Sequence, residues 1–463
     1  MLSCMRNLFR QRRTDFLNGV IYRQILLFFF PVFFGTLFQQ LYNTVDAIVV
    51  GNAVGKEALG AVGGSTGTVI NLLVNFVAGL SSGATVVVAQ YYGRGERAGV
   101  RKGVDAGMAL SLVLGGILSL VGIAAAPYIL RLLNVPDEIF PYSLSYMRIY
   151  FAGLLPTLIY NTGAAVLRAV GDSRRPLYFL IVSCVINIVL DIVLVAIVHM
   201  GVEGAATATI IAQTVSCFLI LRTLKMSHDC YQFSFRNMHL DLSVLKQILI
   251  IGLPTGIQSM LYSVANLFIQ ASVNGYGTDT VAAYTAFGKI DAMFWNYSGA
   301  LGTSVMTFCG QNYGAGKVDR VHKGIRESFG IYLIGSTAIS AFCLLFARPI
   351  YRLFTADPSV ISIGVSLMRF IAPFWGTFVG VEILSSSIRS CGDSLVPMII
   401  TALGIGLLRI VWIVGFPGKT VFDTLLCYPV SWILTSLLFI AYYLQGGWQN
   451  RASKQRNRLI QNS

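Results

Sequence analysis

The sequence predicts an all-α polytopic membrane protein whose twelve transmembrane helices form two parallel-repeat six-helix lobes. Three observations carry this prediction. The chain of 463 residues is 55% hydrophobic and only 12% charged, whereas a soluble globular chain carries roughly 25% charged residues. Its apolar runs have the length of a membrane span, about 20 residues each. Finally, polar loop motifs recur at one constant spacing, which indicates an internal duplication.

The apolar runs fall into two groups of six. The first group covers 24–50, 59–89, 104–130, 139–166, 176–198 and 204–224. The second group covers 244–274, 281–310, 325–350, 361–388, 395–416 and 424–445. We therefore predict a cytoplasmic N-terminal tail (1–23), an N-lobe (24–224), a cytoplasmic inter-lobe linker (225–243), a C-lobe (244–446) and a cytoplasmic basic tail (447–463).

Lysine and arginine set the direction of the spans, because cytoplasmic loops are rich in them. With a cytoplasmic N-terminus, most of these residues lie in cytoplasmic loops and tails. The far side then holds only Lys56, Arg131, Arg348, Arg352 and Lys419. No small-residue cleavage site precedes the first apolar run, so we expect no cleavable signal peptide. A multi-pass protein of the cell membrane with both termini in the cytoplasm is expected. The positive charge lies in short loops, so we expect no nucleic-acid partner.

The two groups of spans share loop motifs. Gln90-Tyr91-Tyr92-Gly93-Arg94-Gly95 recurs 221 residues later as Gln311-Asn312-Tyr313-Gly314-Ala315-Gly316. Arg168, Gly171-Asp172-Ser173 and Pro176 recur at the same offset as Arg389, Gly392-Asp393-Ser394 and Pro397. Six spans per half keep both halves in one orientation, a layout typical of alternating-access transporters. We expect a binding cavity between the lobes; a duplicated structural scaffold is the alternative.

Ionisable residues at membrane depth are costly, and therefore indicate function. Asp46 ends a polar stripe on span one that also holds Gln39, Tyr42 and Asn43 at helical spacing. Asn187 and Asp191 share a face of span five, and Thr209 lies at a similar depth on span six. Carboxylate, amide and hydroxyl oxygens bind hard cations such as Na⁺. Two close carboxylates can instead retain a proton. The alternative is that hydrogen bonds between helices satisfy the buried acids.

This cluster has no counterpart in the second half. The 223-residue offset between Pro31 and Pro254 places Asp46 near Ile269, and the offset of 221 places Asn187 and Asp191 at Leu408 and Trp412. Arg409 lies in mid-span instead, where a cation requires an acidic or carbonyl partner.

For the substrate cavity we predict a set of polar and aromatic residues from both halves. They are Gln39, Tyr42, Asn43, Asn161, Tyr262, Lys289, Asp291, Trp295 and Glu382. The alternatives are a solvated helix start for Lys289 and Asp291, and ordinary packing for the aromatic residues.

These motifs resemble the multidrug and toxic compound extrusion (MATE) transporters over nearly the whole chain. The resemblance rests on 311–315, on 168–176 with its repeat, and on span one from Pro31 through Asp46 to Gly51. It is nearest to the prokaryotic branch named for DNA-damage-inducible members. That branch implies two V-shaped lobes and a cation site on Asp46, Asn187, Asp191 and Thr209. A second branch uses acids on helices seven, eight and ten; span seven has none here, although Glu382 lies on span ten.

The predicted function is antiport: Na⁺ or H⁺ enters and organic, cationic or amphipathic drugs leave. We expect a monomer among membrane lipids, a small-molecule substrate and no cofactor besides the coupling ion. The alternative is a flippase for lipids or lipid-linked oligosaccharides of the related superfamily, which Arg409 keeps open. The sequence has no motif for diphosphate or metal-dependent enzyme chemistry at membrane depth, so we expect no enzymatic activity.

Overall fold

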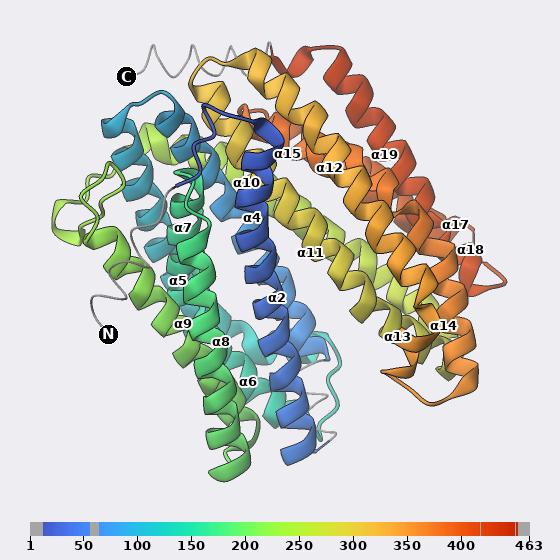
Figure 1. Ribbon diagram of the computed structural model, residues 1–463. Coiled ribbons are helices and arrows are strands. Elements are labelled where there is room, and N and C mark those ends of the chain that lie inside the picture. The colour runs from blue at the N-terminus through green and yellow to red at the C-terminus, as the bar shows by residue number, and fades with distance from the viewer. Residues whose placement is uncertain (1–12, 56–63, 417, 450, 452–463) are drawn as a thin grey trace. The chain divides into compact units, whose positions relative to one another are not determined.

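The computed structural model describes residues 13–55, 64–416, 418–449 and 451, and within them every regular element is helical (Figure 1). The N-terminal half contains α2 (Ile21–Ala53), α4 (Ser65–Gly93), α5 (Arg97–Leu132), α6 (Phe140–Ala152), α7 (Leu154–Ala169), α8 (Arg174–Asp191), η1 (Ile192–Ile197), α9 (Gly201–Lys225) and η2 (Phe235–Asn237). The C-terminal half contains α10 (Leu242–Val273), η3 (Asn274–Tyr276), α11 (Thr278–Gly314), α12 (Val318–Leu345), α13 (Ala347–Arg352), α14 (Pro358–Ile371), η4 (Ala372–Phe378), η5 (Gly380–Leu384), α15 (Ser385–Ser390), α16 (Leu395–Thr401), η6 (Ala402–Leu407), α17 (Leu408–Gly415), α18 (Val421–Leu425) and α19 (Cys427–Leu444). Here η marks a 3₁₀ or π segment. The predicted tails at 1–23 and 447–463 lie mostly outside the described residues.

The observed helices cover the apolar spans predicted from the sequence. In the described part, ten helices are long and apolar enough to cross a membrane, and α6 with α7 forms an eleventh span that bends by 46°. The 37-residue helix α11, which is not among these ten, covers the predicted span 281–310. The twelve-helix prediction is confirmed. The spans predicted at 139–166 and 361–388 are interrupted rather than straight, the first at Gly153 and the second by η4 and η5.

The chain forms two compact units. Unit 1 comprises residues 1–17 and 30–256, and unit 2 comprises 18–29 and 257–463. Two helices therefore contribute to both units: α2 begins in unit 2 and continues in unit 1, and α10 does the reverse. Within unit 2, the start of α2 is held by Arg320, which donates to the Gly19 carbonyl at 2.9 Å, and by Phe29, whose ring lies 5.6 Å from that of Tyr297.

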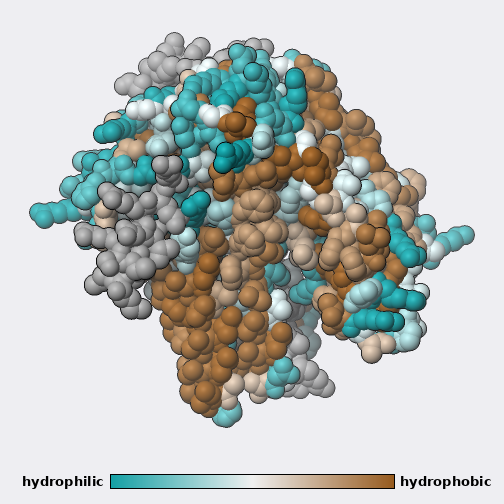
Figure 2. All heavy atoms as spheres, viewed as in Figure 1, coloured by the Kyte–Doolittle hydropathy of each residue, from teal (hydrophilic) through white to brown (hydrophobic). Residues whose placement is uncertain are grey.

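Unit 1 presents the surface expected of a membrane protein. Figure 2 shows hydrophobic residues covering the outer face of the long helices around α8 and α9, where Val185, Val189 and Phe218 are exposed. Polar residues gather at the opposite end of these helices. Such an apolar outer face is stable in lipid, because lipid chains solvate it as well as a protein core does.

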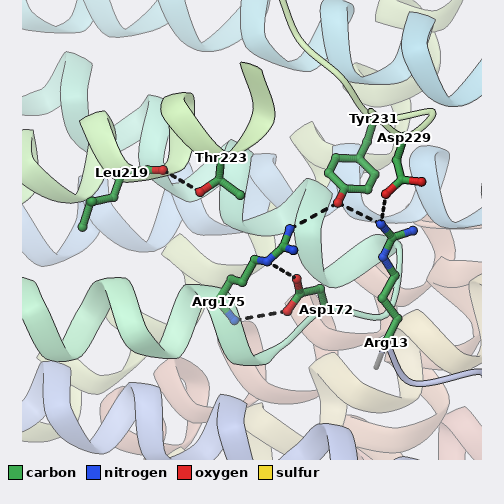
Figure 3. Close-up of polar contacts among 7 residues, drawn as sticks. All are labelled: Arg13, Asp172, Arg175, Leu219, Thr223, Asp229 and Tyr231. Carbon is green, nitrogen blue, oxygen red and sulfur yellow. Dashed lines mark hydrogen bonds and ion pairs between the residues drawn. The ribbon is translucent and has the colours of Figure 1, made fainter. Parts of the chain in front are cut away.

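At the polar end of unit 1, an interhelical loop is fixed to its neighbours (Figure 3). Arg13 forms an ion pair with Asp229 and donates to the Tyr231 hydroxyl at 2.9 Å. Arg175, at the start of α8, donates to the same hydroxyl at 3.3 Å and pairs with Asp172. The loop is thus tied both to the N-terminal segment and to α8.

Helix α10 begins where Asp241 caps it. One Asp241 oxygen accepts from the Ser243 hydroxyl at 2.6 Å and from the backbone nitrogens of Ser243 and Val244. The other pairs with Lys102 at 3.0 Å. The Ser243 hydroxyl and the Lys102 ammonium hold the pKa of Asp241 at about 2, because both stabilise its carboxylate. This N-cap satisfies the free backbone donors of the helix start.

The sequence repeat is also a repeat of backbone geometry. Gly95 and Gly316 have φ values of +74° and +75°, and Gly171 and Gly392 are also left-handed. The bonds around the first pair match one for one at the offset of 221: Gly95 N to Tyr92 O and Gly316 N to Tyr313 O, both 3.0 Å. The glycines recur because an L-residue is strained in this conformation.

We predict a graded loss of stability for alanine substitutions at two left-handed glycines of unit 1, Gly95 and Gly171. Gly95→Ala should destabilise by about 1–2 kcal/mol, the strain of a left-handed L-residue, because no atom lies within 4 Å of the added Cβ. Gly171→Ala should unfold at a lower temperature still, because its Cβ would lie 2.5 Å from the Thr14 carbonyl oxygen. Melting temperatures of the two purified variants in detergent test this order; a reversed order would contradict it.

Helix α10 enters unit 1 through a glycine seam with α4. Gly79 and Gly83 on α4 face Gly252 and Gly256 on α10, and each set has the spacing that lets helices approach closely in membranes. A Cβ on Gly83 would lie 2.4 Å from the Ile248 carbonyl oxygen, and one on Gly79 would lie 2.6 Å from the Gly256 Cα. These contacts are with backbone atoms, so the two helices have no room for a side chain here.

Candidate functional site

The four residues predicted to form the cation site lie in unit 1, on α2, α8 and α9 (Figure 1). Asp46 and Thr209 are 6% and 7% exposed, and Asn187 and Asp191 are fully buried. The helices are in contact around them. Gly35 of α2 brings its backbone against Leu180 of α8, and Gln213 of α9 donates to the Tyr42 hydroxyl of α2 at 3.3 Å.

The polar contacts inside this cluster are few. The Asn187 amide donates to the Thr209 hydroxyl at 3.5 Å, which joins α8 to α9. In contrast, Oδ1 of Asp46, Oδ1 of Asn187 and both carboxylate oxygens of Asp191 are buried and accept no hydrogen bond from any described residue. Asp46 and Asp191 are also close enough for their charges to interact.

Four buried oxygens without a donor cost free energy. An unsatisfied buried acceptor costs about 1–3 kcal/mol, and more when it is charged. Two carboxylates in a low-dielectric interior cannot both remain ionised without a compensating positive charge. The residues present can be neutralised by a proton on a carboxyl group or by a hard cation among carboxylate, amide and hydroxyl oxygens. The oxygens of this cluster thus fit either Na⁺ or H⁺.

Two features around the cluster were not predicted from sequence. The π segment η1 begins immediately after Asp191, and such wide turns are frequent at functional sites. Tyr146, which is buried, and Tyr150, which is half-buried, lie on α6 within electrostatic range of Asp46. Their spacing of four residues places both hydroxyls on one face, which is the only signal that the sequence offered.

The predicted polar stripe on α2 is only partly buried. Tyr42 and Asp46 are buried and Gln39 is half-buried, but Asn43 is exposed. Asn161 of α7 is half-buried and donates to the Thr157 carbonyl at 2.9 Å.

In unit 2, Asp291 is held by two tryptophans. The indoles of Trp295 and Trp375 donate to its two oxygens at 2.6 and 2.9 Å. Asp291 lies well inside α11, so the interpretation as a solvated helix start is wrong for this residue. Lys289, two residues earlier, is exposed. Trp375 is fully buried, with its ring stacked on Phe294 at 4.9 Å.

The remaining predicted cavity residues of unit 2 are half-buried. Glu382 lies in the π segment η5 against Gly302, whose missing side chain makes room for it: a Cβ there would be 1.8 Å from a Glu382 oxygen. The Tyr262 ring lies 6.4 Å from that of Phe378.

Arg409 has carbonyl and hydroxyl partners, as expected for a buried cation. Its Nη1 donates to the Asn266 side-chain oxygen at 3.2 Å and its Nε to the Ser431 hydroxyl at 3.0 Å. The guanidinium is 4.5 Å from the centre of the Tyr428 ring. These contacts give Arg409 partners within unit 2, so its presence alone does not favour the flippase alternative.

Known proteins share this architecture. The MatE family profile matches residues 31–193 and 254–414. A protein called probable multidrug resistance protein YpnP, from Bacillus subtilis (strain 168), is 29% identical over 444 residues, covering 94% of this chain and 97% of its own. A probable multidrug resistance protein NorM from Thermotoga maritima is 25% identical over 448 residues, covering 95% and 96%. A structure described as an outward-facing multidrug resistance MATE family transporter superposes with a TM-score of 0.88 at 23% identity, covering 96% of this chain and 99% of its own.

Proposed function

The chain belongs to the MATE family of multi-pass membrane transporters, and we propose that it exports organic compounds in exchange for an entering cation. This proposal rests on the four buried oxygens of Asp46, Asn187 and Asp191 that accept no hydrogen bond from the described part of the chain. Such a cluster does not stabilise the fold by itself, because burying each oxygen without a hydrogen bond costs free energy until a proton or a cation binds. Relatives named as multidrug resistance proteins support organic drugs as the substrate class, and we propose that these drugs are cationic or amphipathic.

In the proposed cycle, Na⁺ or H⁺ enters from outside and binds at Asp46 and Asp191, with Asn187 and Thr209 supplying neutral oxygens. Neutralising the carboxylates removes the cost of their burial and favours a different bend of α2. Pro31 lies inside α2 and lacks a backbone donor, so it offers a position at which this helix can bend. Substrate then leaves as the transporter changes state. The substrate cavity predicted above, the cytoplasmic termini and the monomeric state belong to this proposal. The DNA-damage-inducible branch remains a prediction.

Flux in proteoliposomes tests the coupling. A fluorescent organic cation is loaded, and a Na⁺ gradient and a pH gradient are imposed separately. One gradient should accelerate flux by about 5- to 150-fold, the usual range of coupling between two sites. Dissipating that gradient with an ionophore should abolish the acceleration. Equal flux with and without either gradient would contradict cation coupling.

A further inference from the structure

Unit 2 holds a buried cation of its own. Arg409 of α17 is 2% exposed. It is bound by the Asn266 amide oxygen on α10, the Ser431 hydroxyl on α19 and the face of the Tyr428 ring. Placing a guanidinium in a protein interior costs several kcal/mol unless its contacts compensate. Three elements of the fold therefore converge to hold this single charge.

No carboxylate is bonded to Arg409. Among the described residues it forms no ion pair, and Asp291, the acid within electrostatic range, gives its two oxygens to the indoles of Trp295 and Trp375. The charge is balanced by an amide oxygen, a hydroxyl and an aromatic face, with the acid at longer range. Neutral oxygens with a nearby acid are also the donor set of a small-cation site.

The repeat relates this arrangement to the cation cluster of unit 1. Helices α10, α17 and α19 are the second-half counterparts of α2, α8 and α9, which carry Asp46, Asn187 and Thr209. The offset is 223 for the first span of each half, where Pro254 corresponds to Pro31, and 221 for the later spans. These offsets place Asn266 at Asn43, Arg409 at Ile188 and Ser431 at Ile210. Asn43 is three residues from Asp46, and the other two positions are one residue from Asn187 and Thr209, so along the helix axes all three residues lie within one turn of the equivalent places.

The oxygens of the unit 1 cluster and those around Arg409 in unit 2 differ in their hydrogen-bond donors. In unit 1, acceptors of Asp46, Asn187 and Asp191 have no donor among the described residues. In unit 2, the acceptors Asn266 and Ser431 both receive hydrogen bonds from Arg409. One unit needs a cation from outside, and the other contains a cation as part of its chain.

We propose that Arg409 is a permanently tethered cation, at the place in unit 2 that corresponds to the exchangeable cation site of unit 1. On this view, which rests on the proposed function of unit 1, unit 2 takes up no coupling ion at this place. Of these two corresponding places, only the one in unit 1 binds an ion that the gradient supplies. Arg409 is then a positioning residue, whose charge holds α10, α17 and α19 together in the same way that a bound ion would.

A matched pair of substitutions separates charge from shape. Arg409→Lys retains a tethered cation, and its gradient-driven flux in proteoliposomes should stay within about threefold of the wild type. Arg409→Gln retains hydrogen-bonding groups but no charge, and its flux should fall by about tenfold or more, the equivalent of 1.4 kcal/mol or more. If Gln fails to reach the membrane while Lys transports, the proposal is supported, because only the charged variant is competent. Equal loss in both variants, or equal retention, would overturn it.

Chemical rescue gives a second readout. Arg409→Ala opens the space that the guanidinium fills, and guanidinium ions at millimolar concentration should restore its flux severalfold. Urea, which has a similar shape but no charge, should not. Restoration by both compounds, or by neither, would overturn the proposal. Asp46→Asn in the same assay distinguishes the two hypotheses: if it retains ion-driven flux, the proposed function of unit 1 fails, independently of the Arg409 results.

Discussion

Replacing Asp46 with Asn is expected to remove the acceleration of export by the ion gradient. The gradient-driven rate should fall by about 5- to 150-fold, which is the usual size of coupling between two binding sites. The amide has nearly the size and shape of the carboxyl group, so the packing of α2 against α8 and α9 should persist. It cannot release a proton or carry a negative charge. The cluster would retain Asp191 as its single acid, too little charge to attract and then release a cation.

The measurement is flux in proteoliposomes under the gradient that drives the wild type, normalised to protein inserted. Asp105→Asn provides the matched control. Asp105 is also a buried acid of unit 1, 3% exposed, but it lies on α5 and accepts from the His239 backbone at 3.3 Å. We expect that variant to keep its ion dependence. Wild-type flux in Asp46→Asn, or the same loss in Asp105→Asn, would remove the case for Asp46 as the ion site.

A leucine at Gly83 is expected to destabilise the protein by about 3 kcal/mol, at the upper end of typical overpacking costs. Its Cβ would lie 2.4 Å from one backbone atom of α10 and 2.8 Å from another, the Gly252 nitrogen. Because these atoms belong to a helix backbone, no rotation of a side chain relieves the overlap. The helices must separate, and α10 loses its contact with α4 in unit 1.

The control for this substitution is Gly116→Leu on α5. A Cβ at Gly116 meets no atom within 4 Å, and replacing a mid-helix glycine removes its conformational cost. The melting temperature in detergent should therefore fall for Gly83→Leu and stay level or rise for Gly116→Leu. A similar fall in both variants would show that the seam is not as tight as its geometry indicates.

Much of this fold could be predicted from sequence, because the bilayer imposes a simple rule on composition. Spans of about 20 apolar residues are visible without any knowledge of packing, and turn motifs such as that ending at Gly95 recur because left-handed backbone demands glycine. The breaks in helices could not be predicted in the same way. The bend at Gly153 places its backbone against Ile210 of α9, a contact that depends on tertiary structure.

Helical periodicity predicted which residues of the candidate cation site share one face of a helix. Asn187 and Asp191 share a face by their spacing, but Asn43, placed on the stripe of Asp46 by the same rule, is exposed. Periodicity assigns residues to one side of a helix and does not say how wide the buried side is. The partners of Arg409 were beyond sequence reasoning, because Asn266 and Ser431 come from helices 143 and 22 residues away along the chain.

The division of α2 between the two units has a consequence for how the protein is made. Residues 18–29 pack in unit 2, where the Tyr22 backbone donates to Glu327 at 2.8 Å and Arg320 reaches back to Gly19. A ribosome adds about 5–20 residues per second, so roughly 15–60 s separate the synthesis of this segment from that of its partners. During that interval the start of the first helix lies in the bilayer without its native neighbours. Unit 2 is therefore complete only when residues 257–463 pack against a segment that was synthesised well before them.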